Sequence, residues 1–278
     1  MKRFRKVYVE ISNICNMKCS FCPGTKRRKH ALTEDEFRHI LGKLQGFTDF
    51  VYFHLMGEPL LHPQVLRFLD IAEALGFRVI LTTNGTLLPE KQTALLQHPA
   101  LHKVNISLHA FEANDLDVDF ETYFRNCLAF AREAAGQKII SLRLWNQGGL
   151  ETLNPEILGL MEGVFPKPWA EVRDGYRLAD KTFLNYGEKF DWPDLRAEEN
   201  DGGVFCYGLR DQLGVLCDGT VVPCCLDHEG DIPLGNLFNQ ELSQILDSPR
   251  AKALYDGFTR RCPSEALCRR CGYAKRFG

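Results

Sequence analysis

The sequence predicts an α/β protein in which parallel strands alternate with helices, followed by a smaller unit rich in cysteine. Two observations lead to this prediction. Short β-branched and aromatic runs alternate with helical patterns from residue 6 to about 180, and seven of the eleven cysteines lie beyond residue 205. A chain of 278 residues is long enough to bury a full hydrophobic core in one or two domains.

The first unit contains five predicted strands, each followed by a predicted helix. We expect strands at 6–12, 50–56, 77–82, 103–108 and 138–145, and helices at 33–45, 63–75, 89–97, 119–135 and 155–164. Several of the helices begin at Thr, Pro or Asp and end at Gly. Repeated strand and helix predicts a parallel sheet or barrel, whose ligands collect at the carboxyl ends of the strands.

The second unit begins after a break in this pattern. Residues 180–203 are rich in Gly, Pro, Trp and acidic residues, so we expect a linker or long loop there. Beyond it we expect a hairpin that turns at Asp218-Gly219, with Cys217 opposite Thr220, and a helix that Ser248 and Pro249 open. The predicted domains are residues 1–195 and 196–278.

Composition excludes several classes of protein. The balance of 34 basic and 36 acidic residues argues against a chain that mainly coats nucleic acid. No apolar run reaches the roughly 18 residues of a membrane span, and no secretory signal opens the chain, so we expect a cytoplasmic protein. An odd number of closely spaced cysteines in such a chain indicates metal ligation rather than a disulfide framework.

The first cysteine cluster follows the first predicted strand directly. Cys15, Cys19 and Cys22 form a CxxxCxxC array. Three thiolates suit a [4Fe–4S] cluster with one iron left open for a substrate or cosubstrate. The alternative is a structural zinc site, in which His30 would supply the fourth ligand.

This array, with Phe21 before its last cysteine, resembles the radical S-adenosylmethionine (SAM) superfamily. The resemblance implies a partial (β/α)6 barrel. It also implies that the open iron binds the amino and carboxylate groups of SAM, and that an electron from the cluster cleaves SAM to a 5′-deoxyadenosyl radical, which abstracts hydrogen from a substrate. In such enzymes the protein supplies positioning and a dry cavity.

Four further segments match the family in order, each at a strand end. They are Gly57-Glu58 in an MGEP segment where the family has GGEP, Asn84 in a TNG turn, Ser107, and Arg143. The resemblance implies that Glu58 and its neighbours hold the SAM amino group, and a guanidinium such as that of Arg143 suits its carboxylate. The predicted SAM-binding residues are Phe21, Gly57, Glu58, Asn84, Ser107 and Arg143.

The C-terminal unit resembles the SPASM and twitch extensions of radical SAM enzymes, which bind auxiliary iron–sulfur clusters. Its signature is Cys206, a spacer to Gly219, and Cys224 after four more residues. We expect one fully ligated auxiliary [4Fe–4S] cluster on Cys206, Cys224, Cys268 and Cys271. The predicted hairpin would place Cys217 roughly 13 Å from Cys224, at about 3.3 Å per residue. A zinc ribbon is the alternative.

The remaining cysteines have other interpretations. Cys217, Cys225 and Cys262 do not match the usual spacing of a second auxiliary cluster. Cys127 lies in an amphipathic helical pattern and is expected to be a core residue.

Basic and histidine residues near these motifs suggest further roles. The run Lys26–His30 is either a solvated face or a docking patch for an acidic electron donor such as flavodoxin or ferredoxin. His54 and His109 are candidate proton acceptors in the cavity, and His109 is the candidate catalytic residue. The aromatic segment 183–192 would line the substrate cavity or cover the barrel mouth.

The sequence therefore predicts a radical SAM oxidoreductase. We expect the auxiliary cluster to accept an electron from the substrate radical, which gives dehydrogenation or crosslinking of a small molecule or a peptide. The alternatives are a maturase of ribosomally made peptides with two auxiliary clusters and, from another class, a zinc-binding adaptor protein.

Overall fold

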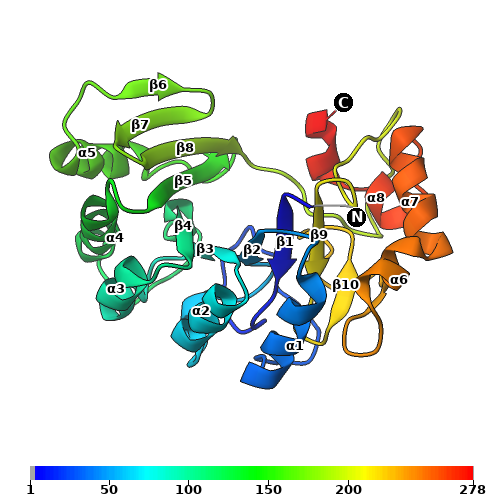
Figure 1. Ribbon diagram of the computed structural model, residues 1–278. Coiled ribbons are helices and arrows are strands. Elements are labelled where there is room, and N and C mark those ends of the chain that lie inside the picture. The colour runs from blue at the N-terminus through cyan, green and yellow to red at the C-terminus, as the bar shows by residue number, and fades with distance from the viewer. Residues whose placement is uncertain (1–3, 278) are drawn as a thin grey trace.

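The computed structural model describes residues 4–277, whose strands form one mixed sheet. Its order is β11-β10-β9-β1-β2-β3-β4-β5-β8-β7-β6. Six strands of the first unit lie side by side and parallel at its centre: β1 (Lys6–Val9), β2 (Phe50–Phe53), β3 (Arg78–Thr83), β4 (Leu101–Ser107), β5 (Ile139–Gln147) and β8 (Thr182–Glu188). The five strands predicted in the first unit and the six-stranded parallel barrel are thus confirmed (Figure 1).

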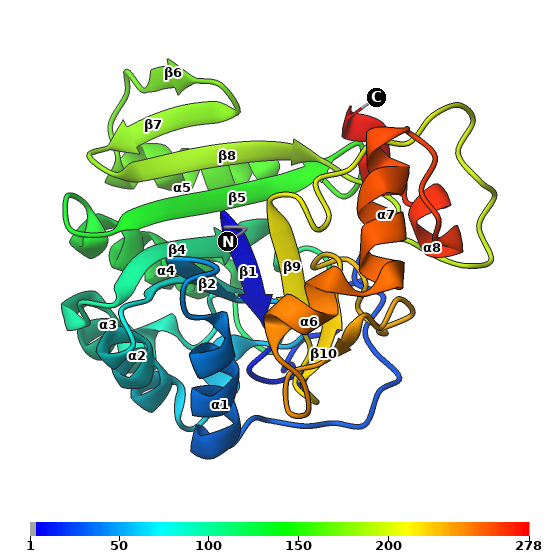
Figure 2. The same ribbon diagram turned by 45° about the vertical axis from the view of Figure 1, so that its right-hand side comes forward.

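Five helices connect or follow these strands: α1 (Glu34–Leu44), α2 (Val65–Ala74), α3 (Leu88–Gln97), α4 (Phe120–Ala134) and α5 (Asn154–Val164). They lie along one side of the curved sheet (Figures 1 and 2). Each lies within two residues of its predicted range. α1 shows the local cause, because Thr33 and Glu36 form a reciprocal capping box at its start while Phe37, Ile40 and Leu41 are buried against the sheet.

The loop predicted at 180–203 is wrong for its first part. Residues 182–188 form β8, which pairs in parallel with β5 and buries Thr182 and Leu184. The hairpin of β6 (Ala170–Val172) and β7 (Gly175–Ala179) then extends the sheet beyond β8. The Gly, Pro and acidic residues around this short strand predicted a loop instead. The strand is stabilised by tertiary pairing with the edge of β5.

The C-terminal unit continues the same sheet. It contains β9 (Gln212–Val215), β10 (Thr220–Val222), β11 (Gly235–Asn236), α6 (Leu242–Asp247), α7 (Pro249–Thr259) and α8 (Ala266–Arg269). β9 pairs in parallel with β1, and β10 and β11 add in antiparallel. The predicted start of α7 is confirmed, because the Ser248 side chain accepts from Ala251 N and Pro249 is the first helical residue.

The predicted register of the hairpin is wrong by one residue. Val215 lies opposite Val221, and Leu216 N donates to Thr220 O, so Cys217 does not pair with Thr220. The turn has three residues and ends on Gly219 at φ 83°, the left-handed position that this type of loop requires.

Alternation along the parallel strands separates the core from the interior of the barrel. On β1, Val7 and Val9 are fully buried against the helices, whereas Lys6 and Tyr8 line a central cavity. Three short 3₁₀ helices complete the fold: η1 (Pro59–Leu61), η2 (Leu108–Ala110) and η3 (Gly272–Phe277). None of the described helices is both long enough and apolar enough to cross a membrane.

Candidate functional site

The loop after β1 carries Cys15, Cys19 and Cys22, and two of these thiols belong to exposed residues. The turn after β2 is hydrogen-bonded to the backbone of this loop, since Glu58 N donates to Ile14 O at 2.9 Å. At Gly57 (φ 80°) a Cβ would lie 2.4 Å from Ser12 O. Only glycine fits there, so the GEP segment fixes where the cysteine loop begins.

Two neighbours hold the thiols of this loop. Asn114 Nδ2 donates to Cys19 Sγ at 3.0 Å, and Met17 N donates to Cys15 Sγ at 3.4 Å. Burial raises the pKa of Cys19 to about 11, and the nearby Cys22 and Cys15 also raise it. A bound cationic centre would favour the thiolate forms instead.

The zinc alternative for this loop does not fit the structure. His30 Nε2 lies 3.4 Å from Glu36 Oε2 at the start of α1, and its backbone N–H donates to Asn13. In residues 4–277 no group of three His, Cys, Asp or Glu side chains is placed to hold a single metal ion. Three cysteines in one loop, with the candidate fourth ligand engaged elsewhere, suit an iron–sulfur cluster better.

Glu58 is 2% exposed, and its carboxylate accepts three hydrogen bonds within the chain. Its carboxylate accepts from Thr83 Oγ1 and Asn84 N, both at 2.7 Å, and from Leu60 N at 3.0 Å. Burial raises the pKa of Glu58 to about 7, although the three hydrogen bonds oppose the shift. Glu58 therefore ties the ends of β2 and β3 together.

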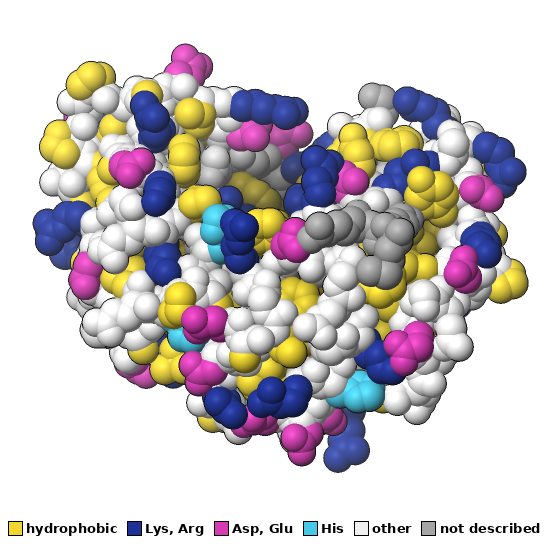
Figure 3. All heavy atoms as spheres, in the orientation of Figure 1, with side chains coloured by type: hydrophobic (Ala, Val, Ile, Leu, Met, Phe, Trp, Pro, Cys, Tyr) yellow, Lys and Arg dark blue, Asp and Glu magenta, His cyan; other side chains and the backbone are white. Residues whose placement is uncertain are grey.

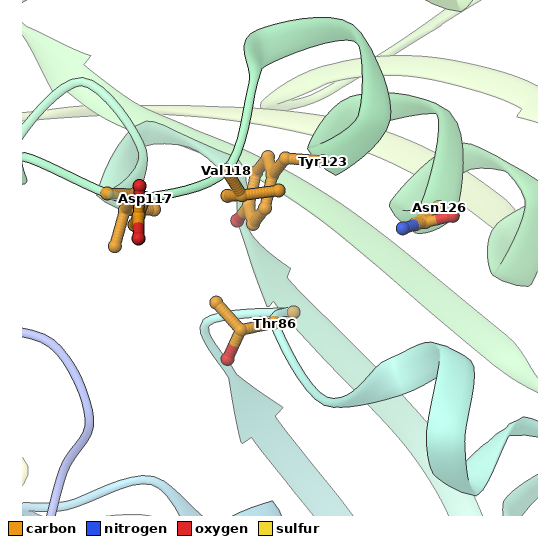
Figure 4. Close-up of a pocket in the computed structure, with 7 residues that line it drawn as sticks. Thr86, Asp117, Val118, Tyr123 and Asn126 are labelled. Atoms are coloured by element: carbon orange, nitrogen blue, oxygen red, sulfur yellow. The ribbon is translucent and has the colours of Figure 1, made fainter.

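Asn84 connects the turn after β3 to the cysteine loop. Its Nδ2 donates to Asn16 Oδ1 at 2.8 Å, and its Oδ1 accepts from Thr86 N at 3.0 Å. A pocket of about 250 Å³ lies beside this turn. Figure 4 shows Thr86 facing Val118 and Tyr123 across it.

A cavity of about 550 Å³ fills the interior of the barrel. Figure 3 shows the molecule hollowed between the β5–β8 side and the C-terminal helices, with Lys and Arg side chains on both sides of the hollow. The lining comes from five parallel strands, the cysteine loop, β9 and η3. Of the predicted residues, it includes Phe21, Ser107, His109, Arg143 and His54.

Arg143 is the notable polar group of this cavity. Its Nε is buried without a hydrogen-bond partner among the described residues, and its Cζ lies 4.2 Å from the centre of the Trp145 ring. Burial lowers the pKa of Arg143 to about 10. Ser107 lies opposite Arg143 in the β4–β5 register. A guanidinium with a buried, unpaired Nε beside a hydroxyl suits a carboxylate or phosphate ligand.

His109 and His54 are both neutral at pH 7. Burial lowers the pKa of each to about 4. His109 Nδ1 lies 3.1 Å from Arg143 O, and its ring packs 5.0 Å from that of Phe21. His54 lines the cavity next to Tyr8. A neutral imidazole is the form that can accept a proton.

The C-terminal cysteines surround a second, smaller cavity. Its lining includes the predicted quartet Cys206, Cys224, Cys268 and Cys271. Burial raises the pKa of Cys224 and Cys268 well above the usual value, and mutual repulsion of the thiolates adds to the shift. The other walls are mainly apolar side chains of Pro193, Pro223, Ile232, Phe258, Leu267 and Ala274. Four thiols in a dry enclosure fit a fully ligated iron–sulfur cluster.

The three cysteines outside the quartet lie elsewhere. Cys225 lines the central cavity, on the opposite side from Cys224. Cys217 is buried beside Arg27, whose Nη1 lies 3.8 Å from its Sγ, and Cys262 is exposed. Cys127 is fully buried in α4, as expected for a core residue.

The contacts of Asp227 and Arg27 were not predicted from the sequence. Asp227 also lines the quartet cavity, where its buried carboxylate accepts from Asp231 N and Ile232 N. Arg27, expected on a solvated face or docking patch, instead forms a buried ion pair with Glu10. Neither residue has a distinctive sequence signal, because each partner lies far along the chain or in an irregular loop.

Two family models match this chain. The radical SAM superfamily matches residues 9–133, and an iron–sulfur cluster-binding domain, SPASM, matches residues 206–272. Both domains imply [4Fe–4S] clusters.

Two of the curated relatives match part of this chain. The AdoMet-dependent heme synthase of Methanosarcina barkeri is 28% identical over 140 residues, which are 49% of this chain and 39% of that protein. The S-adenosyl-L-methionine-dependent 2-deoxy-scyllo-inosamine dehydrogenase of Niallia circulans is 28% identical over 116 residues, 39% of this chain and 46% of that protein. The chain thus spans less than half the length of each.

Solved structures share the fold over nearly the whole chain. BtrN in complex with AdoMet and 2-DOIA superposes with a TM-score of 0.63 at 17% identity, covering 98% of this chain and 94% of that one. Streptococcus suis SuiB bound to the precursor peptide SuiA gives a TM-score of 0.61 at 14% identity, covering 99% and 71%. The chain therefore carries a radical SAM domain over residues 9–133 and an iron–sulfur cluster-binding domain of the SPASM type over residues 206–272.

Proposed function

We propose that this protein is an oxidoreductase that cleaves SAM reductively, abstracts hydrogen from a small-molecule substrate and removes one further electron from the substrate radical. One observation carries the proposal. The central cavity reaches from Phe21 in the first cysteine loop to Cys225 and Tyr273, which neighbour ligands of the C-terminal quartet. A substrate in this cavity would lie between the two cysteine sites.

Two sets of thiols would hold the clusters. Cys15, Cys19 and Cys22 would hold the first and leave one iron open, while Cys206, Cys224, Cys268 and Cys271 would ligate the second fully. When bound, the first cluster supplies the electron that cleaves SAM to a 5′-deoxyadenosyl radical, and the second supplies an acceptor for the substrate's electron.

The chain's own residues position and shield the reactants. Gly57, Glu58 and Asn84 shape the floor under SAM, and Ser107 and Arg143 supply a hydroxyl and a guanidinium for its polar groups. The aromatic walls of the cavity exclude water from the radical. His109 is our candidate acceptor for the proton that the substrate loses, because its imidazole lines the cavity, although its pKa of about 4 makes it a weak base.

Two domains and an external electron source complete the proposal. We assign residues 1–195 to the barrel and 196–278 to the auxiliary unit. Exposed Lys18, Lys26 and Arg28 surround the first cysteine loop and suit an acidic flavodoxin or ferredoxin. All eleven cysteines are free, which is in keeping with a reducing cytoplasm.

The rival with two auxiliary clusters has less support. It needs ligands beyond the quartet, whereas Cys217 is buried beside Arg27 and Cys225 faces the central cavity. The volume of that cavity suits a small molecule better than a long peptide. The zinc-binding adaptor is not supported, because both matched domains are iron–sulfur domains.

The test is iron and sulfide content after anaerobic reconstitution, with 5′-deoxyadenosine formation measured in parallel. We expect about eight irons, falling to about four in the Cys15, Cys19 and Cys22 to Ala variant, which forms no 5′-deoxyadenosine. The Cys268→Ala/Cys271→Ala variant is expected to keep SAM cleavage and lose oxidised product. Full product from that variant would refute the role of the second cluster, and zinc without sulfide would refute the whole proposal.

A further inference from the structure

The central cavity carries an excess of positive charge. Among the described residues, its charged side chains other than histidines, tyrosines and Cys225 are Arg5, Lys6, Lys103, Arg143, Lys189 and Asp211. Asp211 forms an ion pair with Arg5 and accepts its hydrogen bond. The other four cations form no salt bridge within the described part of the chain.

These charges act on one another across the barrel. Burial, and then the nearby Arg143 and Lys6, lowers the pKa of Lys103 to about 8. Lys103 projects from β4 and Lys6 from β1, on different walls of the same cavity. Unpaired cations that lie close together in a poorly solvated cavity destabilise the empty state, and a bound anion would offset that cost.

The two lysines lie away from the segments assigned to SAM. Lys103 precedes Ser107 by four residues on β4, which is roughly 13 Å at about 3.3 Å per residue. Lys6 is the first residue of β1, whereas the cysteine loop follows the opposite end of that strand. Arg143, level with Ser107, can serve the SAM carboxylate, and the lysines remain for another group.

The rest of the lining limits the shape and polarity of that group. Asn105 Oδ1 is buried without a hydrogen-bond partner in residues 4–277, although Asn105 Nδ2 donates to Leu81 O. Asn105 lies between Lys103 and Ser107 on the same strand and lines the cavity. The rings of Tyr8 and Tyr52 pack nearby at an interplanar angle of 43°, with ring centres 5.0 Å apart. A ligand here would need a hydrogen-bond donor and a flat or apolar body.

We propose that the substrate is a small oxyanion, a phosphate ester or a carboxylate, whose charged group lies between Lys6 and Lys103 and whose hydroxyl or N–H donates to Asn105. This inference rests on the proposed function, because it assigns the substrate class of the same cavity. The aromatic side chains around the lysines pack against the body of the substrate, and Arg143 stays with SAM.

The test is anaerobic titration calorimetry on the reconstituted protein, saturated with SAM. Phenyl phosphate and benzoate are the anionic probes, and benzyl alcohol is the uncharged control. We expect at least one anion to bind while the alcohol does not, and the tighter anion identifies the oxyanion class. Lys6→Met and Lys103→Met should each weaken binding by about 10-fold or more.

Two control variants separate loss of the anion site from damage to the fold and from a general effect of removing a lysine. Lys103→Arg keeps the charge and should keep binding, so a fall in both Lys103 variants would indicate damage to the fold rather than loss of the anion site. Lys252→Met removes an exposed lysine on α7 that pairs with Asp247, and it should bind the probe as the unaltered protein does.

Three outcomes would overturn the inference: equal binding of alcohol and anions, binding by Lys6→Met and Lys103→Met at full strength, or no anion binding at millimolar concentration. Probe binding to the SAM-free protein that is lost on addition of SAM would also overturn it, because the cations would then hold the SAM carboxylate. The same preparations are assayed for 5′-deoxyadenosine. If it forms while the probes do not bind, the anion site is wrong and the proposed function stands; if it does not form, the proposed function itself fails.

Discussion

The ion pair between Glu10 and Arg27 joins three parts of the molecule. Arg27 Nη2 and Nη1 donate to the Glu10 carboxylate at 2.6 and 2.8 Å, and Arg27 Nε donates to His228 O at 2.8 Å. The same carboxylate accepts from Cys217 N at 3.0 Å and Met56 N at 3.3 Å. This pair therefore fastens the loop after the first cysteines to the C-terminal unit and to the end of β2.

Arg27→Met would leave Glu10 buried without its counter-charge. The Glu10 side chain is fully buried, and that of Arg27 is 13% exposed. Breaking a buried pair costs about 3–5 kcal/mol, and we expect about 3 kcal/mol because two backbone N–H groups still face the carboxylate. At about 2–4 °C per kcal/mol, the melting temperature should fall by roughly 6–12 °C.

Circular dichroism of the reconstituted protein during heating measures this change. The matched control is Arg38→Met, which removes an exposed pair with Glu34 on α1 and should cost at most about 0.5 kcal/mol. Equal melting temperatures for Arg27→Met and Arg38→Met would refute the reasoning, because the buried pair would then contribute no more than a surface one.

Three further predictions concern single residues. Gly57→Ala should lower the iron content to about four per chain, since the added Cβ would lie 2.4 Å from Ser12 O and displace the cysteine loop. The control is Gly42→Ala on α1, where a Cβ meets nothing within 4 Å, and this variant should keep its full iron content and stability. Burial, and then Arg143, lowers the pKa of His54 to about 4, so the contribution of His54 to stability is full above about pH 6.5 and is lost as the pH falls toward 4. The free energy of unfolding in urea, measured across that pH range, should therefore depend less on pH in His54→Gln than in the unaltered protein. The same pH dependence in both proteins would contradict the shift. Cys127→Ala should destabilise by about 1 kcal/mol in the same unfolding assay without loss of iron, and iron loss would show that this thiol is more than a core residue.

The sequence predicted most of the fold because its signals are local. Strand and helix periods, the Thr33 cap and the Ser248–Pro249 start are readable within a few residues, and they matched the structure. The strand at 182–188 was missed because its stability comes from pairing with β5 rather than from its own composition. The hairpin register failed for a related reason, since a two-residue and a three-residue turn share the same Asp-Gly signal.

By itself, the sequence predicted both domains, which the family models match, and it supplied the two proposed sets of cysteine ligands, because ligand spacing along a loop is a local property. Only the tertiary structure decided what those sites face. It placed Lys6 and Lys103 from distant strands in one cavity, and it buried Arg27 against Glu10 instead of leaving it in a basic surface run. Burial and charge pairing depend on residues far apart in the chain, so no local pattern records them.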